Sequence, residues 1–257
     1  QDNLTTATYS DSGSFSLQLS GADPDADDNL TYVLVSDAQY GTTSLDNQTG
    51  VLTYTPYDNL SAGFSAQDNV TFYVTDGLSN STTQTYSFNV LGSNDVPAVA
   101  NQTSSVSEGS SVVLTLNGSD VDGDSITAIT VLNTPSYGTY TLGPLTEHVP
   151  GNSTIQLTYT PYDNLSALTY TETISYQSTD NQSENSTVGT ISLTVTGQND
   201  LPTAQDNLTT DNYSDNGSVS LQLSGSDPDT ADNLTYVLVS DAQYGSTSLD
   251  NQTGLVT

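Results

Sequence analysis

Residues 52–62 read LTYTPYDNLSA, and residues 157–167 repeat this stretch letter for letter. Its first half alternates Leu and Tyr with Thr, which is the period-two pattern of a half-buried strand. Pro, Asp and Asn follow, and these residues favour a turn. Two identical strand-and-turn segments, 105 positions apart, indicate that the chain is an array of repeated β units.

The repeat extends in both directions from this stretch. Residues 1–53 return as residues 205–257 at a constant offset of 204, with about four residues in five identical. Between them lies a diverged copy, in which GSDVDGDSITAITVL at 118–132 corresponds to GADPDADDNLTYVLV at 21–35. The repeats therefore follow an A–B–A order. We predict three units: unit one at 1–95, unit two at 96–200, and unit three at 201–257, a partial near-copy of residues 1–53.

The spacing of strand and turn signals predicts an all-β fold. Turns with Gly, Pro, Asn and Asp recur about every ten residues, the spacing of a β-sandwich, and no segment has a helical period. The run 190–195, TISLTV, alternates cleanly between polar and apolar residues. The strands expected in unit two lie near 98–104, 112–116, 125–132, 138–142, 155–159, 172–177 and 189–196.

The charge of the chain excludes several functions. It has 30 acidic residues, no Lys and no Arg, and a formal net charge of −30. We expect no nucleic-acid partner and no attraction to anionic lipid, because both interactions need basic side chains. No apolar run approaches the roughly 18 residues of a membrane span, and there is no Cys to form disulfides. Bound or screening cations are expected to balance the charge.

Several motifs resemble a known family. Unit one contains DPDADD, then LTYVLV, YGTTSLDNQTGVLTYTP, NVTFYVTDG and the linker NDVP. In this order they resemble the cadherin-like tandem repeats of large bacterial and archaeal surface proteins, over the whole chain. Tyr40 and Tyr137 stand where that family often has His, and unit two has STDN in place of its Asp-Gly pair. The resemblance implies tandem Ig-like β-sandwiches, often stabilised by calcium, in an extracellular stalk, adhesin or scaffold.

Acidic clusters recur once in each unit. Carboxylates on alternate residues of a tight loop can converge on one hard cation, and Ca²⁺ takes about six to eight oxygen ligands. Gly123 permits such a turn in unit two. Solvated Asp-rich turns are the alternative, because Asp also favours turns. The candidate metal ligands in these clusters are Asp23, Asp25 and Asp28; Asp120, Asp122 and Asp124; and Asp227, Asp229 and Asp232.

The resemblance also implies that linker oxygens share each cation with the next acidic loop. Calcium bound in this way would stiffen the joints and make the array a rod. Glu108, which aligns with Asp11 and Asp215, is a further candidate ligand. The implied joint residues are Asn94 and Asp95 with the cluster of unit two, and Asn199 and Asp200 with the cluster of unit three.

Glycosylation sequons are unusually frequent. Of 21 Asn residues, 17 lie in Asn-x-Ser/Thr, against the roughly six expected from Ser and Thr abundance. Copying of repeats and Asn-rich turns account for part of this excess. We expect N-linked glycans on several of these sites. The candidates are Asn3, Asn29, Asn47, Asn59, Asn69, Asn80, Asn101, Asn117, Asn152, Asn164, Asn181, Asn185, Asn207, Asn212, Asn216, Asn233 and Asn251.

No motif indicates catalysis, so the chain is not expected to be an enzyme. Its one histidine, His148, lies in LTEHVPGN, which is expected to be a surface loop and has no counterpart in the other units. There is no Cys or Lys nucleophile, no G-x-S-x-G and no phosphate-binding loop. Repeated acidic loops are better explained by metal binding.

The expected function is structural: a repeat segment of an extracellular filament, stalk or cell-surface scaffold. The alternative is a cell-surface adhesin, whose ligand would bind its loops or other domains. Neighbouring repeats, or subunits of the same protein, are the expected partners. Unit three lacks the counterpart of residues 54–90, so we expect either that a longer chain continues it or that strands of a neighbouring subunit complete it.

Overall fold

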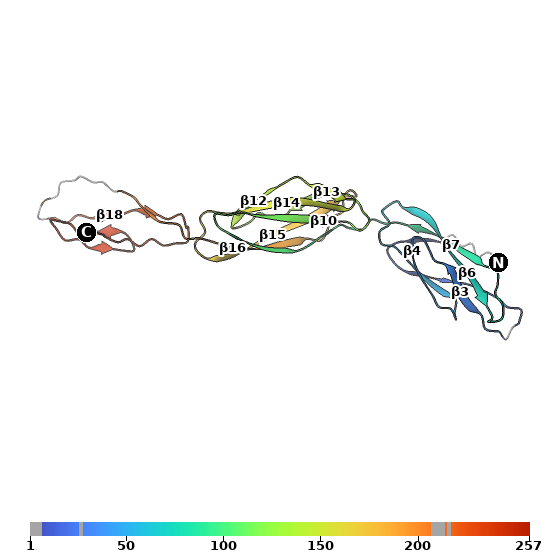
Figure 1. Cartoon of the computed structure of the whole chain (residues 1–257). Helices are drawn as coiled ribbons and strands as arrows, with labels where there is room; N and C mark the ends of the chain where they lie inside the picture. Colours follow the sequence, from blue (N-terminus) through green and yellow to red (C-terminus); the bar gives the residue numbers. More distant parts are fainter. Residues whose placement is uncertain (1–6, 26–27, 207–213, 215–216) are drawn as a thin grey trace.

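The computed structural model describes residues 7–25, 28–206, 214 and 217–257. These residues form strands and turns without any helix, and so they include no helix long and apolar enough to cross a membrane. Figure 1 shows three bodies arranged end to end, which correspond in sequence order to units one, two and three. The expectation of an all-β fold is confirmed.

Unit one is a sandwich of two sheets. One sheet has the order β1-β7-β6-β3, with β1 parallel to β7, and the other has the order β2-β5-β4. The repeated stretch supplies β5, whose Leu52 and Tyr54 are fully buried between the sheets. The strands are β1 (Thr8–Ser10), β2 (Phe15–Gln18), β3 (Thr31–Ser36), β4 (Gly41–Leu45), β5 (Val51–Pro56), β6 (Ser65–Thr75) and β7 (Gln84–Leu91).

Unit two has the same architecture and a separate core. Its sheets have the orders β12-β14-β10-β8, with β13 also on β14, and β11-β15-β16-β9. Leu157 and Tyr159 of the repeated stretch are again fully buried. The strands are β8 (Ala98–Val99), β9 (Gln102–Ser107), β10 (Val112–Ser119), β11 (Ile126–Val131), β12 (Gly138–Leu142), β13 (Thr146–Val149), β14 (Asn152–Pro161), β15 (Thr169–Asp180) and β16 (Gly189–Thr196).

Two details of unit two differ from the sequence prediction. The strand expected near 98–104 is two strands, because β8 pairs with β10 in one sheet and β9 pairs with β16 in the other. The segment around His148, expected to be a loop, contains β13, which folds back on β14. The His148 Nε2 lies 2.7 Å from the Thr154 Oγ1. The sequence of β13 has little apolar alternation, so the pattern did not predict a strand. It pairs because it forms a hairpin with β14, which starts at Asn152.

In each sandwich a buried carboxylate on a central strand, Asp68 on β6 or Glu172 on β15, contacts the turn before a sheet-edge strand. Asp68 accepts hydrogen bonds from the Gln39 and Tyr40 amides, both at 2.8 Å, and from the Tyr54 hydroxyl at 2.9 Å. Glu172 accepts equivalent bonds in unit two, including the Tyr137 amide at 2.7 Å. Such bonds compensate the cost of burying a charge, so these two acids have a structural role.

Unit three has only short strands in its described residues. Two small sheets have the orders β17-β19 and β18-β21-β20. Residues 235–240 repeat the TYVLVS sequence of β3 but form no strand, and Val239 is fully exposed. The strands are β17 (Thr203–Ala204), β18 (Leu221–Gln222), β19 (Gly225–Ser226), β20 (Leu249–Asp250) and β21 (Leu255–Val256).

Candidate metal sites at the joints between units

The acidic loop of unit two begins where β10 ends. The amides of Asp122 and Asp124 donate to the Asp120 Oδ1, at 2.9 and 3.3 Å, and Gly123 has a φ of 76° that few other residues adopt. The Asp120 amide donates to the Gly151 carbonyl at 2.7 Å. One carboxylate oxygen from each of the three acids lies within 4.8 Å of the others. The local turn therefore brings three carboxylates together.

The linker from unit one reaches this loop directly. The Asp95 amide donates to the Asp122 Oδ2 at 2.7 Å, and the Ser61 hydroxyl donates to the Asp122 carbonyl at 2.8 Å. The Asn94 Nδ2 donates to the Asp180 Oδ2 at 3.1 Å. We call Asn94, Asp95, Asp120, Asp122 and Asp124 the first joint. Residues predicted from two different units thus lie in one place.

Four buried oxygens of the first joint have no hydrogen-bond partner. They are the Asn94 Oδ1, the Asp120 Oδ2, the Asp122 Oδ1 and the Asp124 Oδ2. Buried polar atoms are normally paired, and a group of unpaired acceptors in one place is expected where an ion binds. No Lys or Arg exists in the chain to neutralise them. The donor set is entirely oxygen, which suits Ca²⁺ better than a soft metal.

The electrostatics of the first joint agree with its geometry. Burial raises the pKa of Asp95, Asp120 and Asp122, and neighbouring carboxylates raise it further. The charged forms are therefore disfavoured when no cation is bound. A divalent cation at this place would reverse the balance by stabilising the same charged forms.

Three acidic residues near the first joint were missed by the sequence prediction of its ligands. The charge of Asp58 raises the pKa of Asp95 and of Asp122, and so does that of Asp11. Asp180, at the end of β15, is 1% exposed. Asp58 lies within the repeated stretch LTYTPYDNLSA, and both copies have Asp at this position. A turn does not require Asp there, so the repetition was a signal for a further role.

The second joint, between units two and three, is less complete. The Asp200 amide donates to the Asp229 Oδ2 at 2.9 Å, and the Asp229 Oδ1 is buried without a partner. Glu108 belongs here rather than to the first joint: it accepts from the Gln198 amide at 2.7 Å, and its charge contributes to raising the pKa of Asp200, after burial and the charges of Asp229 and Asp163.

The remaining predicted ligands are arranged differently. Asn199 is exposed, and its Nδ2 donates to the Asp200 carbonyl at 2.6 Å. In unit one, oxygens of Asp23, Asp25 and Asp28 lie within 4.8 Å of one another, but the three residues are only half-buried or exposed. Among the described residues, the acids of unit three, Asp227, Asp229 and Asp232, do not meet that distance.

The described sequon asparagines lie at the surface. All are exposed except Asn117 and Asn152, which are half-buried. Some of these side chains accept hydrogen bonds through the amide oxygen, as Asn69 does from the Ser87 hydroxyl and Asn101 from the Thr190 amide. Four sequons, Asn3, Asn207, Asn212 and Asn216, lie outside the described residues.

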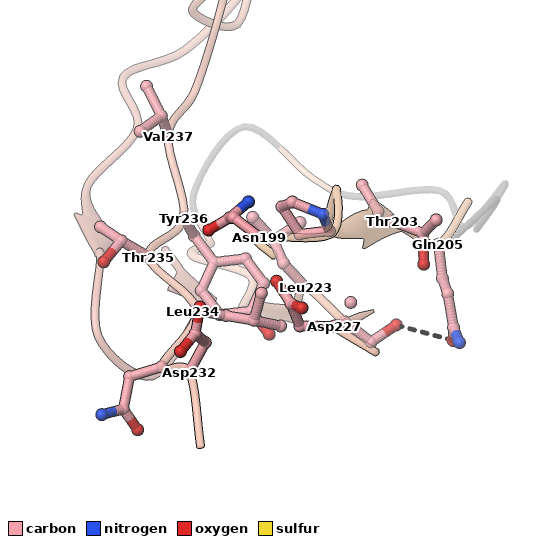
Figure 2. Close-up of a pocket in the computed structure, with 15 residues that line it drawn as sticks. Asn199, Thr203, Gln205, Leu223, Asp227, Asp232, Leu234, Thr235, Tyr236 and Val237 are labelled. Atoms are coloured by element: carbon pink, nitrogen blue, oxygen red, sulfur yellow. Dashed lines mark hydrogen bonds between the residues drawn. The ribbon is translucent and has the colours of Figure 1, made fainter. Parts of the chain in front are cut away.

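A pocket of about 490 Å³ lies in unit three. Figure 2 shows Leu223, Leu234 and Tyr236 around it. The same space in unit one is filled by β6: a Cβ added at Gly21 would lie 2.7 Å from Val74, whereas Gly225, its counterpart, meets no such residue. The pocket is therefore the uncovered half of a sandwich core, and the candidate ligands Asn199, Asp227 and Asp232 also line it.

The fold and its joints define a class: tandem Ig-like β-sandwiches linked through acidic loops. The sequence model of the bacterial Ig domain matches residues 1–89 and 94–195. The chain belongs to the bacterial Ig domain family. That family is non-catalytic and typical of surface and extracellular proteins. No curated protein matches the chain.

The solved structures to which the chain is similar include cadherin repeats. A fragment of protocadherin gammaB7, domains EC3-6, is 15% identical with a TM-score of 0.43, covering 97% of this chain and 62% of that chain. Protocadherin gamma C5 EC1-3 is 18% identical with a TM-score of 0.42, covering 88% and 77%. The protocadherin gammaB4 extracellular domain is 16% identical with a TM-score of 0.41, covering 89% and 37%.

Proposed function

We propose that this chain is a structural segment of an extracellular or cell-surface array, in which Ca²⁺ at the joints fixes one unit relative to the next. The observation that carries the proposal is the set of four unpaired, buried oxygens at the first joint. They come from the linker and from the acidic loop of the next unit, so one cation would hold both. Units divide at 95/96 and 200/201 in this proposal.

The proposed ligands follow from the contacts. At the first joint they are Asn94, Asp95, Asp120, Asp122 and Asp124, with Asp11 and Asp58 close enough to raise the pKa of Asp122. The second joint would use Glu108, Asp200 and Asp229, with Asp227 nearby. Bound calcium would offset the like-charge repulsion at each joint and restrict hinge motion between the units.

Calcium titration and solution scattering together test this function. Isothermal titration should detect Ca²⁺ uptake at low ionic strength, and small-angle scattering should show a longer, better-defined particle with Ca²⁺ than with a chelator. Mg²⁺ at the same concentration is the control, because it demands a smaller octahedral site. A chain that takes up no Ca²⁺, or whose scattering does not respond, contradicts the proposal.

We also propose that several sequons carry N-linked glycans. The surface position of the described sequon asparagines supports this, because an oligosaccharide needs access to the amide nitrogen. Glycans on these exposed sites would increase the hydration of an array that has no basic residues. Intact mass of the native protein measures their occupancy, and a mass of 26.9 kDa for these residues would contradict it.

A further inference from the structure

Strand β12 leaves one edge of a unit-two sheet open. It pairs with β14 from Gly138 to Leu142 without any register shift. The Tyr162 amide donates to the Tyr137 carbonyl at 2.9 Å, and the Gly143 amide to the Gln156 carbonyl at 2.8 Å. Because hydrogen-bonded positions alternate along an antiparallel strand, the main-chain groups of residues 138, 140 and 142 face away from β14.

The corresponding edge of unit one is protected by charge. There, Asp37 accepts a hydrogen bond from the Thr43 hydroxyl in the middle of β4 at 2.5 Å, and Asp46 follows the strand directly. Charges beside an edge strand are a common device against pairing with another chain. In unit two, Thr134 and Gly143 stand at the positions of these two acids, and residues 125–146 contain no charged residue.

Other sheet edges of the two complete units differ from β12 in length, register or neighbouring charge. Strand β2 has four residues, and β9, which runs parallel to β16, is followed directly by Glu108. Strands β3 and β11 each have a register shift where they pair with their neighbours, and such bulges twist an edge away from a partner. Strand β8 has two residues and β1 has three. Thus β12 combines a regular register, five residues and freedom from charge.

We propose that β12 pairs with β12 of a second copy of this chain, antiparallel and centred on Tyr140. Gly138 of each copy then faces Leu142 of the other, and the outward groups form about six main-chain hydrogen bonds. Thr139 faces Thr141 across the contact on the outer face, a favourable cross-strand pair. The pairing would join arrays side by side.

A second copy suits this edge better than an unrelated strand. An antiparallel edge is complementary to itself, so no other sequence is required. Two chains with a charge of −30 repel each other. The repulsion at close approach is smallest where the facing surfaces carry no carboxylate. In Figure 1, β12 lies along the flank of the middle body.

Cysteine cross-linking tests the pairing and its register, because the chain has no native Cys. Full chains carrying Thr139→Cys and Thr141→Cys are mixed under mild oxidation, and Thr42→Cys with Ser44→Cys on β4 is the matched control. Pairing raises the effective concentration of the two thiols, so mixed disulfides should form at least about tenfold faster on β12 than on β4. Each β12 variant alone should cross-link slowly, because residue 139 of one copy faces residue 141 of the other. Two copies of the same cysteine then lie diagonally across the contact and not opposite each other.

A second substitution separates pairing from chance collision. Leu142→Pro removes an outward N–H that makes no bond in its own sheet, so the fold is retained while the mixed disulfide slows to the β4 rate. Far-ultraviolet circular dichroism checks the fold, and Thr134→Asp with Gly143→Asp repeats the test by restoring the acids of unit one. Equal rates on β12 and β4, rates insensitive to these substitutions, or a strictly monomeric wild type in sedimentation would overturn the proposal.

Discussion

Replacing Asp122 by Asn should change the stability of the chain in opposite directions with and without calcium. The carboxylate oxygens of Asp120, Asp122 and Asp124 lie within 4.8 Å of one another. Two unit charges at that distance repel by about 0.9 kcal/mol in bulk water and about 3.5 kcal/mol at an effective dielectric constant of 20. Asn can keep the bond that Asp122 accepts from the Asp95 amide. We therefore expect D122N to stabilise the chelated chain by about 1–3 kcal/mol.

With calcium the same substitution should weaken the joint. Loss of an outer-shell partner typically lowers metal affinity about 10–100-fold, and a direct ligand should matter no less. We expect Ca²⁺ affinity at the first joint to fall about 100-fold, which is about 2.8 kcal/mol. The stabilisation that calcium gives to the wild type should shrink accordingly.

Urea unfolding followed by tyrosine fluorescence measures both effects, because the chain has 16 Tyr and no Trp. Each variant is unfolded in chelator and in saturating Ca²⁺. Asp46→Asn is the control: it changes an exposed turn acid whose Oδ1 accepts from the Gln48 and Thr49 amides, and its calcium response should equal that of the wild type. A D122N chain that is destabilised in chelator, or that keeps the full calcium response, would refute the reasoning.

Three further outcomes are expected. Leu19→Ala should cost about 2–5 kcal/mol in urea unfolding, because Leu19 is 1% exposed, whereas Leu223→Ala, at the matching half-buried position, should cost about 1 kcal/mol or less; equal losses would contradict the difference in packing. Burial and the Asp68 carboxylate raise the pKa of Tyr54 above its ordinary value of 10.0, so its neutral form is favoured by folding. The contribution of Tyr54 to stability should be constant below pH 10 and should fall above it by up to about 1.4 kcal/mol per pH unit. Tyr54→Phe should reduce that slope. Enzymatic removal of N-glycans from the native protein should raise its electrophoretic mobility. A band whose mobility does not change after glycosidase treatment would contradict glycosylation of the sequons.

The sequence predicted the strands best where apolar and polar residues alternate without interruption. The TISLTV run and the repeated LTYTP became β16, β5 and β14 with the expected buried residues. The identical TYVLVS segments limit such reasoning: β3 pairs with β6 from Thr31 to Ser36, whereas residues 235–240 have no such partner and form no strand. Strand formation here depends on a distant segment as well as on local propensity.

The joint was predicted in its main members but not in full. The D-x-D spacing and the linker motif pointed to Asp95, Asp120 and Asp122, which lie together. Asp58 and Asp180 were missed, because their approach to the joint depends on the turn after β5 and on the end of β15 rather than on local spacing. Glu108 was predicted as a ligand, and the fold places it at the second joint, next to the linker of its own unit.

The distribution of charge along the fold links these observations. In the described strands of units one and two, the acids are Asp68, Glu172, Asp180 and Glu147, and the first three are buried. The exposed sheet faces therefore carry mainly Ser, Thr and amide side chains, with pairs such as Ser36 and Thr71 hydrogen-bonded across strands at 2.6 Å. Most carboxylates lie in turns and at the joints, and the repulsion between them is greatest where two units meet.

A divalent cation would have its largest effect at those same places, since it would stabilise the contact between units while leaving the uncharged flanks unchanged. The two proposed interactions, one along the array and one across it, thus depend on separate surfaces and should respond independently to calcium and to substitution of β12.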